Sequence, residues 1–363
     1  MIYSINVQNV GLNLMNEEYK PSYRWNLTDL EKVKKNGLKV FSCFACGGGS
    51  TMGYKLAGFD VIGANDIDPE MAWHYQENHK PKYYYLEDIR KFRQRNDLPK
   101  ELYDLDILDG SPPCSSFSMA GSREKGWGKK KQFREGQAHQ TLDDLFFDFI
   151  ELARKLQPKV VIAENVKGML IGNAKGYVKQ IINLFNVSGY DVQLFLLNAA
   201  TMGVPQMRER VFFVCKRKDL KVTPLKMGFY GKPISVKEAF DSIVEVNTKG
   251  KDLSSSSMRK YWDMCKPGEA FSKYHPEKSL FTQKKIQKNG PCFTITAGAP
   301  LWHYDSPRKL SQQEACVLGS YPMDYKFKKD DLALYMIGMS VPPLMTYGVA
   351  NQVYRQWFKN GKA

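Results

Sequence analysis

The sequence lacks the features that mark membrane proteins, secreted disulfide scaffolds and repeat proteins. Its longest apolar runs, such as Val160–Ala163 and Val211–Cys215, are far too short to cross a bilayer. The first fifteen residues contain no basic residue ahead of an apolar stretch, so a secretory signal is not expected. The seven cysteines are an odd number scattered over a long chain, which excludes a disulfide framework and favours reduced thiols in the cytoplasm. No internal repeat is visible.

What the sequence has in excess is positive charge. It carries 53 Lys and Arg against 38 Asp and Glu, a net charge of +15. Such a balance favours a polyanionic partner, most often nucleic acid. The apolar share of 43% and the charged share of 25% are those of ordinary globular proteins, which excludes a disordered chain. The length of 363 residues fits two domains, or one large domain with an insertion.

From residue 38 onward, short apolar runs alternate with helical patterns. Strands are expected at residues 38–45, 59–64, 83–86, 104–108, 160–163, 191–197 and 211–215. Helices are expected at residues 51–57, 71–78, 142–156 and 178–185. This alternation predicts an α/β fold with a mostly parallel sheet that is covered by helices on both faces.

The pattern changes near Lys216. Residues 216–305 have irregular periodicity and contain 17 basic against 9 acidic residues, and helical patterns return at 311–318 and 343–357. We therefore expect four parts: an N-terminal extension at 1–37, a large α/β domain at 38–215, a small basic domain at 216–305, and a C-terminal segment at 306–363 that returns to the α/β domain.

A glycine-rich turn, Phe44–Gly53, comes after the first expected strand. Glycines let the backbone approach a ligand closely, and a strand, glycine turn and helix at the end of a parallel strand are typical of a nucleotide-type site. The run does not match G-x-G-x-x-G, which disfavours a pyrophosphate dinucleotide. Asp66 ends the second strand where an acid would bind ribose hydroxyls, and Asp88 comes after the third. The alternative is an ordinary turn with solvated acids.

A cysteine in a proline-rich loop comes after the fourth expected strand, in the run Asp109–Ser118. The pair Pro112-Pro113 fixes φ and would aim Cys114 at the carboxyl edge of the sheet. The flanking serines and prolines are not core composition, which disfavours a buried structural cysteine. Cys43 and Cys46 have a C-x-x-C spacing, but without a second such pair we predict no metal site.

Two further groups of polar residues lie at strand ends. Glu164 comes directly after the apolar run Val160–Ala163, where a carboxylate is costly unless it is paired or functional. Arg208 and Arg210 lie just before the next apolar run and would face the same side of an extended segment. Taken alone, the two arginines would be interpreted as a surface salt-bridge ladder.

The segment between Cys114 and the helix expected at 142–156 is long and basic. A stretch of this length without regular structure argues for a function such as a lid, and the alternative is a solvated charged loop. Aromatic side chains, Trp127 and Phe133, are interleaved with its basic residues. The basic residues are Arg123, Lys125, Lys129, Lys130, Lys131 and Arg134.

Together these pieces resemble the C5-cytosine DNA methyltransferases. The resemblance rests on FACGGG, NDIDPE, EDI, GSPPCSSFS, ENV and PQMRER, in that order. Arg308–Ser311 and Gly338–Pro343 resemble the closing motifs of the family, so that the match covers residues 38–215 and 306–357. The resemblance implies a Rossmann-like class I methyltransferase domain at 38–215 and a small target-recognition domain at 216–305.

The resemblance also implies S-adenosylmethionine as the cofactor and S-adenosylhomocysteine as its product. The glycines would approach the methionine part, Asp66 the ribose, and Ile67 and Asp88 the adenine. The implied cofactor residues are Phe44, Gly47, Gly48, Gly49, Asp66, Ile67, Asp88, Pro113, Ser340 and Val341. The sequence departs from the family pattern at Ser42, where an acid is usual, and at Cys46, Met336 and Met339.

For catalysis, the resemblance implies attack of Cys114 on C6 of a cytosine that is flipped out of the duplex. Glu164 would hold the N3 and N4 edge of the base, and Arg210 would hold O2 with Arg208 beside it. The implied DNA contacts are Ser118, Arg123, Lys125, Lys129, Lys130, Lys131 and Gln206. The predicted activity is that of a DNA (cytosine-5-)-methyltransferase acting on double-stranded DNA.

Two alternatives keep the same fold. An enzyme that methylates cytosine in transfer RNA would use every catalytic residue, but the size of segment 216–305 favours DNA recognition. A non-catalytic DNA-binding regulator would have lost cofactor binding through Ser42, Cys46 or Met339. We expect a monomeric cytoplasmic protein of prokaryotic or phage origin without membrane association, for which a cognate restriction endonuclease is a candidate partner.

Overall fold

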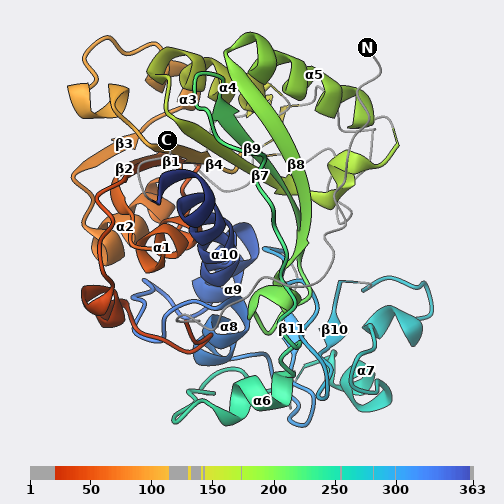
Figure 1. Ribbon diagram of the computed structural model, residues 1–363. Coiled ribbons are helices and arrows are strands. Elements are labelled where there is room, and N and C mark those ends of the chain that lie inside the picture. The colour runs from red at the N-terminus through yellow and green to blue at the C-terminus, as the bar shows by residue number, and fades with distance from the viewer. Residues whose placement is uncertain are drawn as a thin grey trace.

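A seven-stranded sheet forms the centre of the molecule (Figure 1). The computed structural model describes residues 21–113, 130–131, 140–141, 144–172, 174–253, 256–280, 282–298 and 300–359. The strands are β1 (Lys39–Cys43), β2 (Asp60–Asp66), β3 (Tyr83–Leu86), β4 (Ile107–Gly110), β7 (Val160–Val166), β8 (Tyr190–Asn198) and β9 (Glu209–Arg217). Their order is β3-β2-β1-β4-β7-β9-β8, in which only β9 pairs antiparallel, with β7 and β8.

This arrangement confirms the predicted α/β fold with a mostly parallel sheet. The predicted strands are all present, although β4 begins at Ile107 instead of residue 104, because a short 3₁₀ turn at Lys100–Tyr103 lies just before it. The strand order reverses direction between β1 and β4. In open α/β sheets, ligands bind outside the carboxyl ends of the strands at such a switch point.

Helices cover both faces of the sheet (Figure 1). They are α1 (Gly49–Leu56), α2 (Pro69–His79), α3 (Ile89–Phe92), α4 (Leu145–Leu156), α5 (Ala174–Val187), α6 (Val236–Asp241), α7 (Arg259–Met264), α8 (Gln312–Gly319), α9 (Leu332–Met339) and α10 (Pro343–Val353). Shorter 3₁₀ turns lie at Leu27–Lys32, Lys100–Tyr103, Lys167–Leu170, Ala199–Met202 and Phe271–Lys273, and a π-helical turn lies at Tyr354–Phe358.

Two hydrophobic clusters, one on each face of the sheet, form the core. Successive strand residues alternate between them: Val40 belongs to the cluster under α1, α8, α9 and α10, and Phe41 to the cluster under α3, α4 and α5. The same alternation runs along β7 and β9, with Ile162 on one face and Val161 on the other. Burial on both faces explains why these strands are continuous apolar runs.

The segment between β9 and α8 carries a small cluster of its own. Besides α6 and α7 it holds the short strands β10 (Lys284–Lys285) and β11 (Leu301–Trp302), in the lower part of Figure 1. Its buried apolar side chains are Leu253, Tyr261, Trp262, Cys265, Phe271 and Trp302. The Lys285 ammonium lies 3.4 Å from the centre of the Trp262 ring. Outside this segment, between β4 and α4 in the chain, β5 (Lys130–Lys131) and β6 (Gln140–Thr141) form a further antiparallel pair.

The C-terminal helices return to the sheet. Helix α10 packs on α1, and Gly53 of α1 lies directly against the Pro343 carbonyl and Thr346. Residues Leu332–Phe358 are apolar enough for a membrane span by length and composition, but 61% of the apolar window is buried in the molecule. In addition, Ser340 is extended, which breaks the run between α9 and α10. These helices therefore belong to the core.

Candidate active site

The carboxyl edge of the sheet brings the predicted site residues together. The glycine turn comes after β1, Asp66 ends β2, and Pro113 lies three residues after β4. Glu164 lies near the end of β7, directly opposite Phe212 of β9. Because β9 is antiparallel to β7, its first residues lie at this same edge, and Arg210 is paired with Val166. Segments far apart in the sequence thus meet at one switch point of the sheet.

The most direct contact at this edge is an ion pair between Glu164 and Arg210. The Arg210 Nε atom lies 2.9 Å from Oε1 of Glu164, and the two side chains, Glu164 and Arg210, are 11% and 13% exposed. Burial lowers the pKa of Arg210, and the Glu164 carboxylate opposes that effect. A carboxylate and a guanidinium held side by side present a planar set of hydrogen-bond donors and acceptors, which suits the polar edge of a nucleobase.

Asn165 links this pair to the proline loop. Its Nδ2 atom donates a hydrogen bond of 3.0 Å to the Pro112 carbonyl, and its side chain is buried. The contact fixes Pro112-Pro113, the dipeptide immediately before Cys114. Within the ENV run, only the glutamate was expected from the sequence to be functional. The signal for Asn165 was a second polar residue in an otherwise apolar strand.

Neighbouring segments pack closely against the glycine turn. Phe44, Cys46 and Gly48 have φ values of 54°, 49° and 83°, all in the left-handed region. A Cβ atom on Gly48 would lie 2.1 Å from His79 Nε2, and one on Gly49 would lie 2.3 Å from the Val341 carbonyl oxygen. Packing against α2 and the C-terminal segment therefore requires these glycines, a reason that was not among those expected from the sequence.

Asp66 ties the glycine turn to β2. Its Oδ2 atom accepts a hydrogen bond of 2.7 Å from the Cys46 amide, and its Oδ1 atom accepts one of 2.9 Å from the Asp68 amide. Burial raises the pKa of Asp66, and these amide donors oppose that effect. After the third strand, Asp88 caps α3 and pairs with Arg90 at 3.2 Å.

The polar and apolar groups at this edge fit a nucleoside cofactor that carries an amino-acid chain. Asp66 supplies a carboxylate acceptor at the end of the second strand, and Ile67, half-buried, comes next as an apolar surface. Helix α1 begins at Gly49, inside the glycine-rich run Phe44–Gly53, and helix N-termini favour carboxylate groups. Ser340 and Val341 lie against Gly49 on the other side of the turn.

Two predicted residues have other partners than expected. Gln206 is 1% exposed, and its amide group bonds to the Ile295 amide and the Leu318 carbonyl, so it offers no exposed group to DNA. Arg208 is 2% exposed and donates to the carbonyls of Ile295 and Gly338 at 2.9 and 3.0 Å. Since both side chains hold neighbouring segments, we do not retain Gln206 as a DNA contact or Arg208 as a residue that touches the base.

The predicted nucleophile and most predicted DNA contacts fall outside the described residues. These are Cys114, Ser118, Arg123, Lys125 and Lys129, and only the backbone is described for Lys130 and Lys131. The described cysteines are Cys43, Cys46, Cys215, Cys265, Cys292 and Cys316. Burial raises the pKa of every one of these six thiols, to about 12 for Cys46. Each of these six thiols is therefore expected to stay protonated at neutral pH, which makes it a poor nucleophile.

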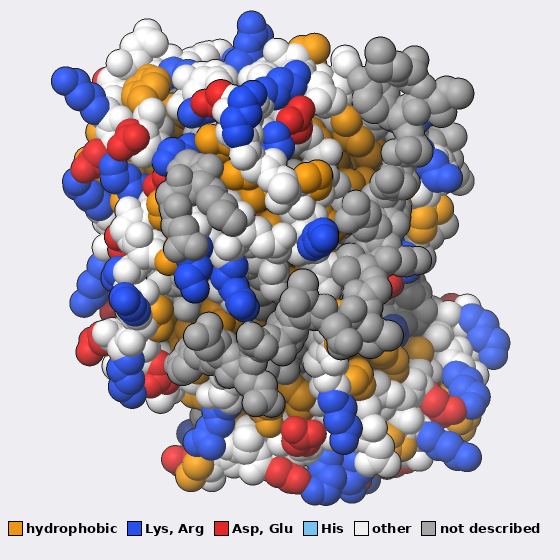
Figure 2. Space-filling model, viewed as in Figure 1, with side chains coloured by type: hydrophobic (Ala, Val, Ile, Leu, Met, Phe, Trp, Pro, Cys, Tyr) orange, Lys and Arg blue, Asp and Glu red, His pale blue; other side chains and the backbone are white. Residues whose placement is uncertain are grey.

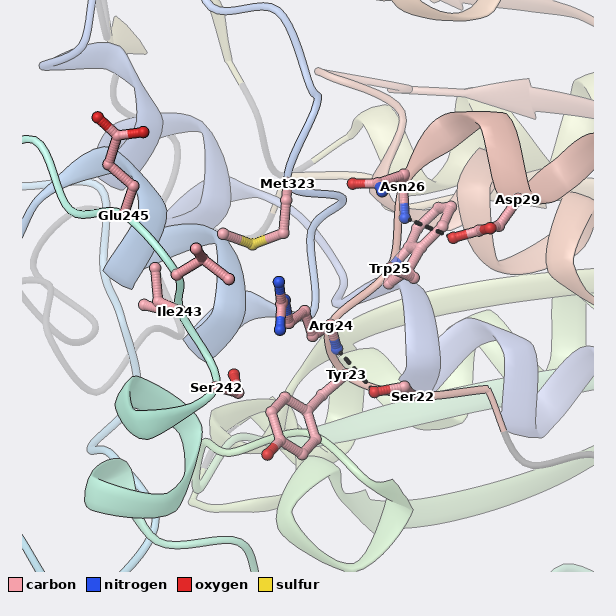
Figure 3. A pocket seen from close by; sticks show the side chains of 11 residues that line it. Ser22, Tyr23, Arg24, Trp25, Asn26, Asp29, Ser242, Ile243, Glu245 and Met323 are labelled. Atoms are coloured by element: carbon pink, nitrogen blue, oxygen red, sulfur yellow. Dashed lines mark hydrogen bonds between the residues drawn. The ribbon is translucent and has the colours of Figure 1, made fainter.

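No group of side chains within the described part of the chain could hold a metal ion. A pocket of about 570 Å³ lies between residues 22–29 and residues 242–245 (Figure 3). Figure 3 shows the side chains of Arg24, Ile243 and Met323 pointing into it. Because none of the predicted site residues lines this pocket, it is separate from the sheet edge described above.

Comparison with known proteins gives a consistent result. Residues 38–355 match the C-5 cytosine-specific DNA methylase family. The type II methyltransferase M.FnuDI of Fusobacterium nucleatum is 31% identical over 87% of this chain and 94% of its own. M.NgoPII of Neisseria gonorrhoeae is 38% identical over 52% of this chain and 50% of its own. The structure of a protein encoded within an E. coli prophage aligns with a TM-score of 0.68 at 22% identity, covering 88% of this chain and 99% of the other, which supports the fold.

Proposed function

The chain belongs to the C-5 cytosine-specific DNA methylase family, and on that premise we propose how it carries out cytosine-5 methylation of DNA. In this proposal, Cys114 bonds to C6 of a cytosine that is flipped out of a specific duplex sequence. The observation that carries it is the buried Glu164–Arg210 ion pair at the sheet edge, next to the Asn165–Pro112 contact that fixes the residues before Cys114.

The reaction requires that C5 become nucleophilic. Addition of the Cys114 thiolate to C6 breaks the aromaticity of the ring, and the displaced charge is taken up at N3 by a hydrogen bond or a proton from the Glu164 carboxyl group, which must be protonated for this step. C5 is then an enamine carbon that can accept a methyl cation equivalent. A base afterwards removes the C5 proton, the C5–C6 double bond re-forms, and the thiolate leaves. Arg210 would hold O2 throughout, since its guanidinium is already oriented by Glu164.

The local charge supports a thiolate at Cys114. Arg208 and Arg210 would place positive charge near Glu164; burial lowers the pKa of both arginines, and the Glu164 carboxylate opposes that effect. An excess of positive charge lowers the pKa of a nearby thiol. Arg208 would act through this charge and through the segments it holds, without contact to the base.

S-Adenosylmethionine is the cofactor that the edge residues fit, and it would supply an electrophilic methyl group. Asp66 would accept hydrogen bonds from the ribose hydroxyls, and Ile67 and Asp88 would lie at the adenine. The glycine turn and the N-terminus of α1 would receive the methionine carboxylate. Phe44, Pro113, Ser340 and Val341 would complete the walls of this site.

The segment 216–305 is our proposed target-recognition domain, with 38–215 and 306–363 forming the catalytic domain. It has a hydrophobic cluster of its own, and Lys and Arg side chains gather on its surface around α7 (Figure 2). Exposed examples are Lys260, Lys266 and Lys278. Such residues contact phosphates and position a protein on DNA, whereas base contacts give specificity. We propose that the protein acts as a cytoplasmic monomer beside a cognate restriction endonuclease.

The test is covalent trapping on DNA. Fluorine at C5 cannot leave as a cation, so a methylated 5-fluorocytosine adduct should remain attached to the enzyme. We expect an S-adenosylmethionine-dependent complex with duplex DNA that survives denaturing electrophoresis, with the peptide mass locating the bond at Cys114. Complex formation should slow as added salt screens the phosphate contacts.

Two variants control this experiment. Cys114→Ser should form no adduct but still bind cofactor and DNA, because a hydroxyl is a far weaker nucleophile at neutral pH. Cys265→Ser removes a thiol from the recognition segment and should trap normally. An adduct through another cysteine would overturn the assignment of Cys114. Trapping on fluorinated transfer RNA but not on DNA of many sequences would favour the RNA alternative.

A further inference from the structure

The carbonyl oxygen of Gly47, in the middle of the glycine turn, has two hydrogen-bond donors. The Tyr325 hydroxyl donates at 2.7 Å and His79 Nε2 lies at 3.1 Å. Both side chains are buried, and they come from distant parts of the chain, His79 from the end of α2 and Tyr325 from the turn after α8. Two donors on one carbonyl fix the orientation of that peptide group.

His79 contributes as a neutral ring. Burial, the largest cause, and the neighbouring Lys55 lower its pKa to about 3. Because Nε2 faces a carbonyl oxygen, this nitrogen must carry the ring proton. The other nitrogen, Nδ1, is buried and has no hydrogen-bond partner among the described atoms. The ring also packs against Gly48, where a Cβ atom would collide with it.

The turn that carries Tyr325 also holds the opposite side of the predicted cofactor site. Tyr321, four residues earlier, donates a hydrogen bond of 2.6 Å to Ser340 Oγ, and Ser340 in turn donates to the Met336 carbonyl. The rings of Tyr321 and Tyr325 lie 5.4 Å apart, edge to face. One short segment after α8 therefore supports both walls of the site.

The orientation of the Gly47 carbonyl matters because helix α1 begins two residues later. The Gly47 carbonyl and the Gly48 amide belong to one peptide group, and that amide donates a hydrogen bond of 2.8 Å to the Ala45 carbonyl. Gly48 has a left-handed φ of 83° and is followed directly by α1. A carbonyl that turned toward the N-terminus of α1 would place negative charge where the helix amides would otherwise meet a carboxylate. Holding it away keeps those amides available.

We propose that His79 and Tyr325 are positioning residues for S-adenosylmethionine, which hold the Gly47 carbonyl away from the methionine carboxylate. This inference rests on the proposed function of the glycine turn as the cofactor site. Neither side chain touches the reacting atoms. Their removal should therefore weaken cofactor binding while leaving the chemistry of the bound complex unchanged.

The experiment measures S-adenosylhomocysteine binding by calorimetry and steady-state methylation by the full-length protein. Tyr325→Phe removes one hydroxyl, and we expect the Kd and the KM for S-adenosylmethionine to rise on the order of 2- to 12-fold, the range for one lost hydrogen bond. His79→Leu should have a similar effect, and His79→Gln, which keeps a donor, should recover part of the affinity. The kcat and the KM for DNA should stay within about twofold.

Tyr84→Phe is the matched control. The Tyr84 hydroxyl is buried near the same aromatic cluster, with its ring 5.3 Å from the Tyr75 ring, but has no hydrogen-bond partner among the described atoms. Its removal should leave cofactor affinity unchanged. Unchanged affinity in folded Tyr325→Phe, or an equal loss in Tyr84→Phe, would overturn the positioning role. Failure of the unsubstituted protein to bind S-adenosylhomocysteine would instead overturn the proposed cofactor site, and this inference with it.

Discussion

At the scale of single residues, Asp109 explains a departure in the sequence. Its carboxylate is buried between three hydroxyl groups: Ser42 at 2.7 Å, Ser50 at 2.8 Å and Tyr54 at 3.1 Å. Ser42 stands where the family usually has an acid, and it pairs directly with Asp109 across β1 and β4. The acid is thus present on the neighbouring strand. There it joins the strand before the glycine turn to the strand before Cys114.

Asp109 should make stability depend on pH. Burial raises its pKa from 3.8 to about 6, so the folded state binds the proton more tightly than the unfolded state. The stabilisation is present below about pH 4 and is lost as the pH rises to about 6, by up to about 3 kcal/mol. Asp109→Asn should flatten this decline in urea unfolding between about pH 4 and pH 7.

A second substitution checks the sign of this effect. The hydroxyl of Ser42 lowers the pKa of Asp109 through its hydrogen bond, so Ser42→Ala should extend the loss of stability to higher pH. Equal pH dependence of the free energy of unfolding in the unsubstituted protein and in Asp109→Asn would contradict the assignment.

At the scale of elements, the packing of α1 on α10 depends on one glycine. A Cβ atom on Gly53 would lie 2.5 Å from both the Pro343 carbonyl oxygen and Thr346 Cβ. Neither neighbour is the free end of a flexible side chain, so the helices would have to separate. Helix α1 is almost wholly buried and begins at the cofactor turn, and α10 comes directly after Ser340 and Val341.

Gly53→Ala should destabilise the protein by about 1–3 kcal/mol, the range for overpacking, despite the higher helix propensity of alanine. Gly176→Ala in α5 is the control, because nothing lies within 4 Å of its Cβ position. This change should stabilise the protein by about 0.5–1 kcal/mol. Both values can be measured by chemical denaturation, and equal effects at the two sites would refute the role of close packing at Gly53.

Particular elements also show how far the sequence predicts the structure. The strands of the sheet and α4 were predicted because their apolar runs and helical periods are local. Helix α9 was missed, since Leu332–Met339 is apolar around most of its circumference and has no polar face. The roles of Gln206 and Arg208 were missed because their partner Ile295 lies nearly ninety residues later, in a segment without a regular pattern.

At the scale of the whole molecule, the segment after β9 makes backbone hydrogen bonds at both ends of the sheet strands. It departs near Lys159, whose carbonyl accepts a hydrogen bond from the Arg217 amide. It returns at the carboxyl edge, where Cys292 pairs with Gln206 and the Met207 amide donates to the Cys292 carbonyl. The start of the segment is tied as well, because the Trp357 indole donates to the Thr223 carbonyl and Leu225 and Val236 belong to the core cluster under α1 and α10.

Exchange of residues 244–285, which contribute no side chain to the core cluster under α1 and α10, for the corresponding segment of a related type II methyltransferase should transfer the target sequence, because base contacts set specificity. Methylation-sensitive sequencing of DNA from expressing cells would reveal the site. An exchange that also replaces 292–297 should lower activity, since it replaces the fully buried Cys292 and Ile295 side chains next to the catalytic segment. An active hybrid that keeps the original specificity would disprove the assignment of the recognition domain.

The contact of the N-terminal and C-terminal parts has a consequence for biosynthesis. The Trp25 indole donates to the Ser320 carbonyl across 295 residues, and α10 covers α1 over a similar distance. At 5–20 residues per second, roughly 15–60 s pass between the synthesis of α1 and that of its cover. During that interval, the face of α1 that α10 covers lacks its packing partner. The cofactor turn should therefore mature only after α10 has been synthesised.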